Sequence, residues 1–351
     1  MTNPPRPSDD RAGAAPPRRD RRAHAADGNA RHVLEAAAEA SGEADAVLAL
    51  VVETEGSTYV EAGAMALFGA AAGQAGWLSG GCLEPEIERH AADAARATRI
   101  EWLEVDTRDD EDLLSGSALG CRGRLRIALL PLRALDGIDT LLDVWCRGRV
   151  ALDWALRGDG SVAASAAAVS REWRLDAAPP RWHAAVDAWM LRIPPPPEAL
   201  LLGAGPETPM LLPLLRELGW RTTLAERRPR WRALATLADR HLDATPSDAA
   251  RAAHAGDAVL VMHHNFELDR EALAALASTE VAFVGLLGPV RRREDLFRVL
   301  PGATREALLP RLRSPIGLKL GGRGSEAIAL SVAAQLQAWR SGEEGSPGVA
   351  G

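Results

Sequence analysis

The sequence has few cysteines, one lysine and no long apolar run. Its 351 residues include three cysteines, Cys82, Cys121 and Cys146, too few for the disulfide framework of a small secreted protein. They are expected to be thiols in a reducing compartment. No stretch reaches the ~18 uninterrupted apolar residues that a membrane-spanning helix requires. We therefore expect a cytoplasmic protein with no membrane span.

A basic surface is also absent. The formal net charge is −7, and residues 1–32 hold seven arginines against four aspartates, so the rest of the chain is more acidic still. Nucleic acid is excluded as the main partner, because phosphate contacts need a basic footprint. Lys319 is the one lysine among 41 basic residues. Arginine and alanine in such abundance indicate a GC-rich bacterial genome.

Length and composition predict a globular chain with two domains. Hydrophobic residues make up 47% and charged residues 25%, the mix of a soluble protein with a sizeable core. The prolines at 194–197 lack backbone donors and mark a natural boundary between domains. The expected organisation is a disordered arm at 1–30, a small α+β domain at 31–135, a connecting segment at 136–197, a Rossmann-like domain at 198–340 and a flexible tail at 341–351.

The pattern before the prolines predicts a compact α+β unit. Apolar periodicity indicates helices at His32–Ala40 and Leu83–Thr98, and strands at Asp45–Glu53, Met65–Phe68, Ile100–Val105 and Leu125–Leu130. The segment that follows is less informative: the alanine run at Ala163–Ala168 indicates no element, and Trp182–Ile193 fits either a helix or a strand.

After the prolines, strands and helices alternate, which predicts a doubly wound parallel sheet. The predicted strands are Ala199–Leu202, Arg221–Ala225, Ala258–Met262 and Val281–Leu287, and the predicted helices are Thr208–Leu218, Trp231–Arg240 and Arg270–Ala277.

A glycine loop joins the first strand of this second domain to its first helix. Gly203 and Gly205 lie in Gly203–Glu207, where glycines allow a tight turn and let helix-terminal N–H groups approach a phosphate. Thr208 replaces the third glycine of the dinucleotide pattern. Glu226 follows at the end of the second strand, where a carboxylate commonly accepts ribose hydroxyls. Arg227 and Arg228 next to it could instead hold a phosphate. The alternative is a glycine turn in a Rossmann-like domain with an empty or degenerate nucleotide site.

A second glycine loop precedes the helix at Leu83–Thr98. Gly80, Gly81, Cys82 and Glu84 lie in Ser79–Glu84, and Cys82 falls near the positive end of that helix. Such a position lowers a thiol pKa and suits a nucleophile or a ligand of metal or sulfur. The alternative is a small buried residue. Cys121 lies in a further glycine-flanked loop and could converge with Cys82, whereas Cys146 is expected in the core.

Other polar clusters are weaker candidates. His263 and His264 end a strand at the ligand-binding edge of the sheet, with side chains on opposite faces, so a joint zinc site is not expected. Gly285 and Gly288 form another edge loop, followed by arginines at 291–293 that could meet an anion. The acidic residues at 106–112 lack the spacing of a calcium loop.

Several motifs in register resemble the XdhC/CoxI family. The first domain carries the segments 53–58 (ETEGST), 63–65 (GAM), 79–84 (SGGCLE) and 119–123 (LGCRG), and the second carries 203–205 (GAG), 263–269 (HHNFELD), 284–288 (VGLLG) and 314–318 (SPIGL). The resemblance spans about residues 32 to 338. The chain departs from the family pattern at Pro206, Glu226 and His263, which bears on nucleotide specificity.

The resemblance implies an accessory factor rather than an enzyme. Such proteins bind the molybdenum cofactor, protect it while its terminal sulfido ligand is installed, and deliver it to an apo molybdenum hydroxylase of the xanthine dehydrogenase type. A cysteine desulfurase is the second implied partner. We expect Cys82 to face the molybdenum or its sulfur, and Gly203–Glu207 with His264 to contact a pterin or pterin dinucleotide. The alternatives are an NAD(P)-dependent oxidoreductase and a nucleotide-binding scaffold, and a homodimer is a common arrangement.

Overall fold

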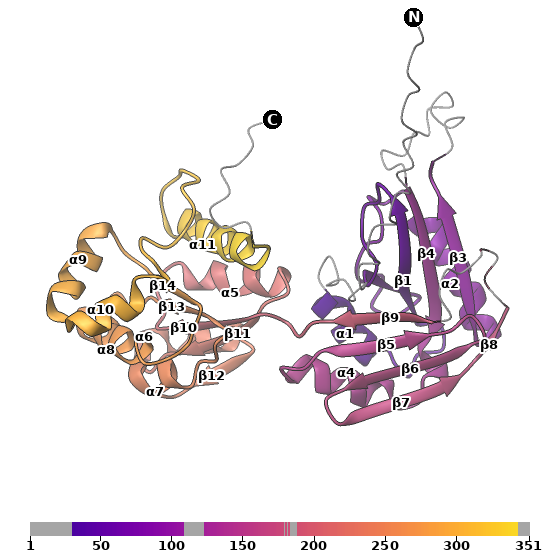
Figure 1. Ribbon diagram of the computed structural model, residues 1–351, viewed down its shortest axis with the longest axis horizontal. Coiled ribbons are helices and arrows are strands. Elements are labelled where there is room, and N and C mark those ends of the chain that lie inside the picture. The colour runs from indigo at the N-terminus through magenta and orange to yellow at the C-terminus, as the bar shows by residue number, and fades with distance from the viewer. Residues whose placement is uncertain (1–29, 109–122, 179, 181, 183–187, 343–351) are drawn as a thin grey trace, which may run out of the picture.

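The computed structural model describes residues 30–108, 123–178, 180, 182 and 188–342. The chain forms two bodies that meet where the prolines at 194–197 pass from one to the other (Figure 1). The predicted fold class is confirmed: a mixed N-terminal part is followed by a Rossmann-like parallel sheet.

The N-terminal body is built on a five-stranded, largely antiparallel sheet with the order β2-β1-β4-β3-β8. Its strands are β1 (Val47–Gly56), β2 (Met65–Phe68), β3 (Arg99–Asp106), β4 (Gly123–Pro131) and β8 (Asp176–Ala177). The predicted strands of this region are all present.

Both faces of β1 are buried, because successive side chains enter different hydrophobic clusters. Val47, Ala49 and Val51 pack on the face covered by α2 (Glu84–Ala97). Leu48 and Leu50 pack on the opposite face, against α1 (Ala30–Glu39) and α4 (Ile138–Arg147). A continuous apolar run is therefore what this central strand requires.

The described residues of 136–197, predicted as a connection, form α4, the short strand β8 of the first sheet, and a second sheet with the order β7-β6-β5-β9. Its strands are β5 (Leu152–Leu156), β6 (Ser161–Ala166), β7 (Val169–Arg174) and β9 (Trp189–Ile193). The alanine run divides between β6, which ends at Ala166, and the turn to β7 at Ala167 and Ala168. In β6, Val162, Ala164 and Ala166 alternate into the same cluster as α1 and α4. Trp189–Ile193 is strand, with every second side chain buried.

The C-terminal body is a six-stranded parallel sheet with the order β12-β11-β10-β13-β14-β15. Its strands are β10 (Glu198–Leu202), β11 (Arg221–Ala225), β12 (Arg240–Leu242), β13 (Ala258–Val261), β14 (Phe283–Leu286) and β15 (Leu312–Arg313). The strand order reverses between β10 and β13, which makes their carboxyl ends the switch point where such folds bind ligands.

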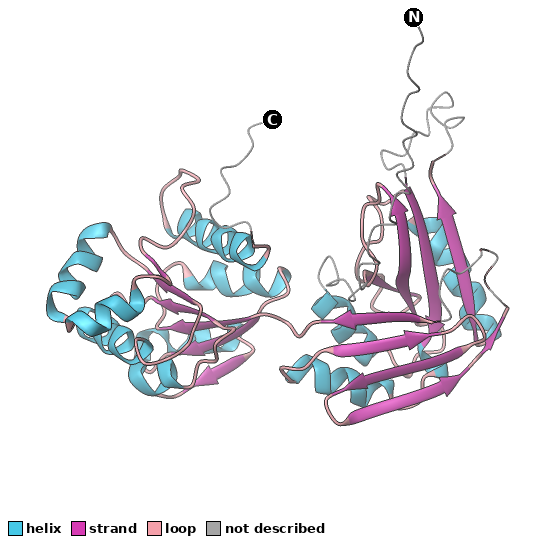
Figure 2. Cartoon of the chain, in the orientation of Figure 1, coloured by secondary structure: helices cyan, strands magenta, loops and turns pink. Residues whose placement is uncertain are grey.

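Helices cover both faces of this sheet, so it is doubly wound (Figure 2). They are α5 (Thr208–Glu217), α6 (Pro229–Arg232), α7 (Pro246–Arg251), α8 (Phe266–Leu276), α9 (Val290–Val299), α10 (Gly302–Leu308) and α11 (Ser325–Arg340). Side chains of α5 and α11 share one cluster with the sheet, and those of α7 and α8 share the other.

One predicted helix is wrong. Trp231–Arg240 is not continuous: α6 ends at Arg232, a 3₁₀ turn spans Ala233–Leu237, and Arg240 begins β12. None of the residues of α6 or of the 3₁₀ turn is buried. The apolar side chains of this segment, among them Trp231, Leu234 and Leu237, are only partly buried against the core, and such shallow packing gives a long helix less of the tertiary support that sustains most helices.

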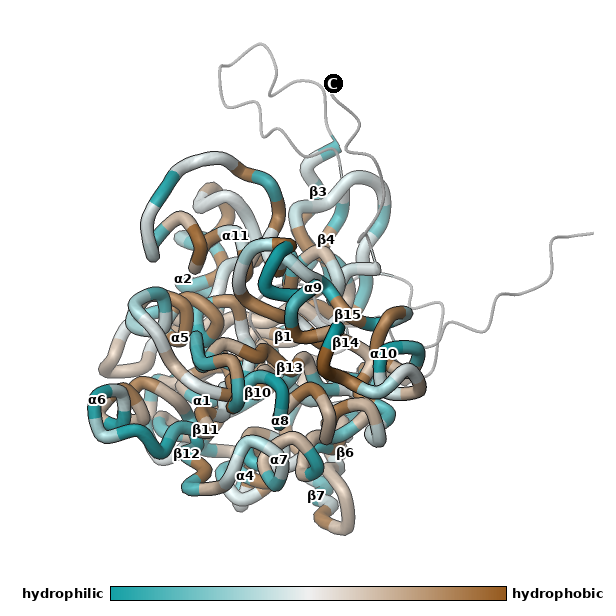
Figure 3. Tube along the Cα trace, turned by 90° about the vertical axis from the view of Figure 1, so that its left-hand side faces the viewer, coloured by the Kyte–Doolittle hydropathy of each residue, from teal (hydrophilic) through white to brown (hydrophobic). Residues whose placement is uncertain are grey.

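The amino edge of the parallel sheet meets the N-terminal body. Arg31 donates to the Trp220 carbonyl at 2.5 Å, Arg221 donates to the Gly148 carbonyl at 2.9 Å, and Arg149 pairs with Asp257 at 2.5 Å. The carboxyl edge lies a strand length away, about 16 Å along β10 at ~3.3 Å per residue, and faces the viewer in Figure 3. Among the described residues, no helix is both long and apolar enough to cross a membrane.

Candidate functional site

The loop before α2 is held in place by one buried carboxylate. Glu84, only 5% exposed, accepts the N–H groups of Leu78 and Ser79 at 3.0 and 2.9 Å and also the Ser79 hydroxyl. The Ser79 hydroxyl oxygen in turn accepts the N–H groups of Gly81 and Leu83, each at 3.1 Å. These bonds close the segment 78–84 into a fixed turn.

The charged form of Glu84 is favoured by these bonds. Burial alone would raise its pKa, but the hydrogen bonds from the Ser79 hydroxyl and from backbone N–H groups outweigh burial and hold the pKa below the ordinary 4.5. Glu84 is therefore a carboxylate at neutral pH.

Cys82 is exposed at the crest of this turn. Its sulfur lies 3.6 Å from the Ser79 hydroxyl. A Cβ at Gly80 would meet nothing within 4 Å, and one at Gly81 would meet only the Trp77 ring, at 3.9 Å. Trp77 is itself 59% exposed. The turn therefore exposes a thiol and an indole ring on the protein surface.

The turn lies at the end of the N-terminal sheet where β4 begins. The carboxyl end of α2 is fixed near the end of β4, because Arg133, which follows β4, donates to the Ala95 carbonyl at 2.9 Å. Since α2 packs along β3 and β4, its amino end points toward Gly123, the first residue of β4. Cys121 lies outside the described residues, so its convergence with Cys82 stays a prediction.

Cys146 is not part of this site. It lies in α4, half-buried against the N-terminal core, and burial raises the pKa of its thiol to about 12. A thiol that stays protonated at neutral pH is a poor nucleophile and metal ligand.

Side chains of the C-terminal body pack against the Rossmann loop, Gly203–Glu207, and accept hydrogen bonds from its backbone. Gly203, with a φ of +89°, packs against the ring of His263, where a Cβ would stand 2.6 Å from the ring. The Ala204 N–H donates to Glu226 at 2.8 Å, and the Gly205 N–H donates to the Thr208 hydroxyl at 2.9 Å. Two of the N–H groups predicted to meet a phosphate, those of Ala204 and Gly205, therefore have partners within the protein.

Glu226 lies at the end of β11 as predicted, but its carboxylate is enclosed. Besides the Ala204 N–H, it accepts the Arg228 N–H at 2.7 Å and the Arg228 guanidinium at 2.5 and 2.9 Å. Burial would raise its pKa, but the Arg228 contacts and the Ala204 bond lower it overall. Arg228 also donates to the carbonyls of Ala204 and His263, at 2.8 and 2.5 Å, and so ties three strand ends together.

The two histidines point to different partners, as expected for neighbours on a strand end. His263 is buried and bonds Asp269 at 3.0 Å through Nδ1. Asp269 is 0% exposed and also pairs with Arg292 at 2.5 Å. His264, half-exposed with a φ of +54°, contacts the buried Glu207 carboxylate at 3.2 Å through Nε2.

A cavity of about 390 Å³ lies beside this network, at the carboxyl ends of β11 and β13. Its walls are largely apolar, with two arginines, Glu226 and His263 at the rim. The lining residues are Ala225, Glu226, Arg227, Arg228, Pro229, Ala244, Pro246, His263 and Leu268.

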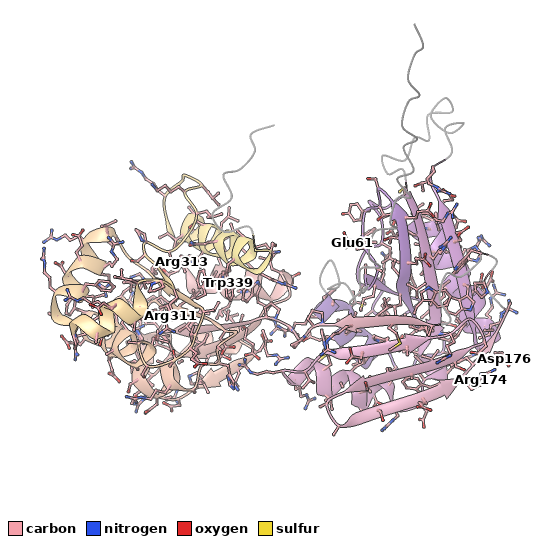
Figure 4. The ribbon with its side chains drawn as sticks, in the orientation of Figure 1. Glu61, Arg174, Asp176, Arg311, Arg313 and Trp339 are labelled. Carbon is pink, nitrogen blue, oxygen red and sulfur yellow. The ribbon has the colours of Figure 1, made fainter. Side chains whose placement is uncertain are left out.

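The described site residues therefore fall into two separate places, one on each of the two bodies that Figure 4 shows with their side chains. Gly80, Gly81, Cys82 and Glu84 gather in the N-terminal body, whereas Gly203, Gly205, Glu226 and His264 gather at the far edge of the C-terminal sheet. Gly285 packs against Ile316, and Gly288 packs against Arg292. In this conformation the structure does not bring the Cys82 turn and the Gly203 loop to one ligand.

Outside the Cys82 turn and the Gly203 loop, three described residues bring potential metal ligands close together. The ligand atoms of His90, Asp93 and Glu101 lie within 4.8 Å of one another. His90 hydrogen-bonds Glu101, and Asp93 pairs with Arg96. These contacts within α2, and between α2 and β3, explain the cluster without a metal ion. At the acidic loop, Asp106 pairs with Arg108 and Arg124, and residues 109–112 lie outside the described part.

Three residues that shape these places were missed as site residues by the sequence analysis. Ser79 and Glu207 stand inside the two glycine loops, and Asp269 lies six residues beyond His263. Arg228 was considered only as a phosphate contact, whereas it pairs with Glu226. Glycine spacing drew attention to the loops, but nothing in the sequence shows that these side chains fold back onto the loop backbone.

Comparison with known proteins gives the same two-part division. Residues 39–106 match the model described as the XdhC and CoxI family, and residues 200–336 match the model described as the XdhC Rossmann domain. A probable xanthine dehydrogenase subunit of Bacillus subtilis (strain 168) is 27% identical over 330 residues, covering 88% of this chain and 97% of that protein.

A solved structure has the same overall fold. The crystal structure of a xanthine dehydrogenase from Bacillus halodurans matches with a TM-score of 0.72 and 26% identity, covering 90% of this chain and 98% of that one. The two family models, which together cover more than half of the chain, and these full-length matches agree with the motifs of both domains. The chain belongs to the XdhC/CoxI family.

Proposed function

We propose that this chain is an accessory factor for a molybdenum hydroxylase of the xanthine dehydrogenase type. It binds the molybdenum cofactor, shields it while a cysteine desulfurase supplies the terminal sulfur, and delivers it to the apoenzyme. Family membership and the xanthine dehydrogenase names of its relatives support the accessory role. The chemistry of the Cys82 turn supports the cofactor.

The observation that carries the proposal is an exposed thiol on a turn that the protein fixes in advance. The Glu84 carboxylate and the Ser79 hydroxyl hold the backbone around Cys82, so ligand binding would not have to order the turn. A preorganised site spends less of its binding free energy on ordering.

The exposed residues of the Cys82 turn are chemically suited to the molybdenum cofactor. Sulfur is a soft donor that suits a soft metal centre or its sulfur ligand. The exposed Trp77 ring beside Gly81 offers a face for a flat pterin ring. Gly80 leaves the approach open, because no protein atom lies within 4 Å of the point where its Cβ would stand.

When bound, the cofactor supplies the metal and the sulfido ligand that the hydroxylase requires. The chain's own residues bind and orient it: Cys82 holds the metal end, and Trp77 covers one ring face and excludes water there. Because the turn lies on the surface, the desulfurase and the apoenzyme can both reach it.

The test is retention of the cofactor by the purified protein. We expect near-stoichiometric pterin and molybdenum after separation of bound from free cofactor, and at least a tenfold loss of retention in Cys82→Ser. Cys146→Ser is the matched control, because that thiol lies outside the turn and should leave retention unchanged.

Circular dichroism of both variants checks that the fold is kept. Equal retention by the wild-type chain and by folded Cys82→Ser would remove the cysteine from the proposal. Absence of retention by the wild-type chain would overturn the cofactor role itself.

A further inference from the structure

The connection between the two bodies has little freedom to bend. The four prolines at 194–197 fix their own φ angles and restrict the residue before each of them, so the segment between β9 and β10 is a stiff spacer (Figure 1). The Trp145 indole donates to the Ile193 carbonyl at 3.3 Å, and the Arg221 N–H donates to the Pro197 carbonyl at 2.8 Å. A hinge absorbs large changes of φ and ψ, whereas this segment is restrained at both ends.

Arg221 of the C-terminal body caps a helix of the N-terminal body. Helix α4 ends at Arg147, and the carbonyls at a helix end have no partner within the helix. The Arg221 guanidinium donates to the carbonyls of Cys146 and Gly148, the latter at 2.9 Å. Its side chain is 12% exposed and also pairs with Glu198 at 2.9 Å. A planar cation that contacts several carbonyls at the negative end of a helix fixes orientation as well as distance.

Two arginines of the N-terminal body cross the junction in the other direction. Arg31, in the first turn of α1, donates to both oxygens of Asp239, at 3.0 and 2.5 Å, and to the Trp220 carbonyl. Arg149, just after α4, pairs with Asp257 at 2.5 Å. The side chains of the two aspartates are only 14% and 4% exposed. A small rotation of one body would break these contacts before water could reach the charges, and an unpaired buried charge is costly.

The contacts are spread along the amino edge of the parallel sheet. Asp239 precedes β12 and Asp257 precedes β13, three strands apart in the order β12-β11-β10-β13. At a strand spacing of about 4.8 Å, the two contacts lie about 14 Å apart. A single contact would leave rotation about it free, whereas two separated contacts and a stiff connection oppose it. The match to the solved Bacillus halodurans structure covers both bodies in one superposition, which supports a fixed arrangement.

Relative movement is the usual expectation for two bodies joined through a polar junction. Arg31, Arg149 and Arg221 form an arginine clamp across this one. We infer that the clamp joins the two bodies into one rigid unit, so that a single chain holds its Cys82 turn and its Gly203 loop apart. Neither domain closure nor bending at the prolines brings the two places to one ligand. A ligand bound at one place reaches the other only after release, and this inference does not depend on the proposed cofactor role.

Pulsed electron paramagnetic resonance of the full chain measures the movement between the bodies. Spin labels on Glu88→Cys, in α2, and on Glu306→Cys, in α10, report the distance between them, and both positions are exposed. The parent chain carries Cys82→Ser, Cys121→Ser and Cys146→Ser, so that only these two positions are labelled. We expect a single narrow distribution of distances.

Variants of this parent chain locate the restraint. Arg221→Ala and Arg31→Ala each remove one member of the clamp and should widen the distribution at least twofold. Arg221→Lys keeps the charge but loses the planar fork, and should speed hydrogen exchange at residues 144–148, the end of α4, at least threefold. Arg240→Ala is the matched control, because Arg240 lines the same cleft between the bodies but forms no ion pair with a described residue. It should leave both the width and the exchange unchanged.

Circular dichroism checks the fold of each variant. A broad or two-peaked distribution in the parent chain would overturn the inference. So would widths in folded Arg221→Ala and Arg31→Ala equal to that in Arg240→Ala. If neither alanine variant of the clamp folds, Arg221→Lys decides, since unchanged exchange at the end of α4 would mean that the Arg221 fork does not hold the two bodies together.

Discussion

Asp269→Ala is expected to lower the free energy of unfolding by about 3–5 kcal/mol, the usual cost of removing one partner from a buried charged pair. Asp269 is fully buried and accepts the backbone and ring N–H groups of His263 as well as the Arg292 guanidinium. Alanine would leave the two His263 donors unpaired inside the protein and the partly exposed Arg292 without its carboxylate, and each unsatisfied buried group costs about 1–3 kcal/mol.

Urea unfolding of the full chain measures this effect, and hydrogen exchange of peptides from β13 and α8 assigns it to the C-terminal sheet. Asp295→Ala is the matched control. That residue lies on α9 and forms exposed ion pairs with Arg291 and Arg298, which typically contribute under about 1 kcal/mol. A loss below about 1 kcal/mol in Asp269→Ala would mean that the buried network does not hold the strand ends together.

The architecture was predictable where the spacing of apolar residues fits a single type of element. The run at Asp45–Glu53 is apolar on both faces because β1 is covered on both faces. The alternation after the prolines predicts a parallel sheet, which is present. Two strands of the second N-terminal sheet, β6 and β7, were missed because they use alanine, serine and charged residues. The period of two in β6 is visible only once Val162 and Ala164 are known to be buried.

The candidate sites were predictable in position and less so in chemistry. Glycine spacing located both loops, and Cys82 lies exposed on one of them; its role as a ligand stays a prediction. What the loops do with their N–H groups depends on side chains that return from elsewhere: Glu84 reaches back five residues to Ser79, and Arg228 encloses Glu226. One signal was readable in advance, because Pro206 in the glycine loop has no N–H for a phosphate.

Glu84→Ala is expected to loosen the Cys82 turn and to destabilise the N-terminal body by about 2–4 kcal/mol. Three donors lose their acceptor: the N–H groups of Leu78 and Ser79, both buried, and the Ser79 hydroxyl. Leaving such groups unpaired costs about 1–3 kcal/mol each, less whatever water recovers. Glu88→Ala, at an exposed position of the same helix, should change stability by less than about 0.5 kcal/mol.

The effect of Glu84 should depend on pH with a definite sign. Its pKa in the folded protein lies below the ordinary 4.5, because the bonds from Ser79 and Leu78 outweigh the opposing effect of burial. A carboxylate with a lowered folded pKa contributes its full stabilisation above the unfolded value and loses it as the pH falls through the folded value. The stability difference between the wild-type chain and Glu84→Gln should therefore be constant from pH 7 down to about 5 and shrink below 4.5.

Urea unfolding at a series of pH values measures this difference, and thiol labelling of Cys82 reports the turn itself. A loosened turn exposes Leu78 and Leu83, now buried beneath it, and should raise hydrogen exchange in 78–84 before global unfolding. If Glu84→Gln matches the wild-type chain in both stability and exchange at pH 7, the carboxylate does not fix the turn. The proposed cofactor site would then have to be ordered by its ligand instead.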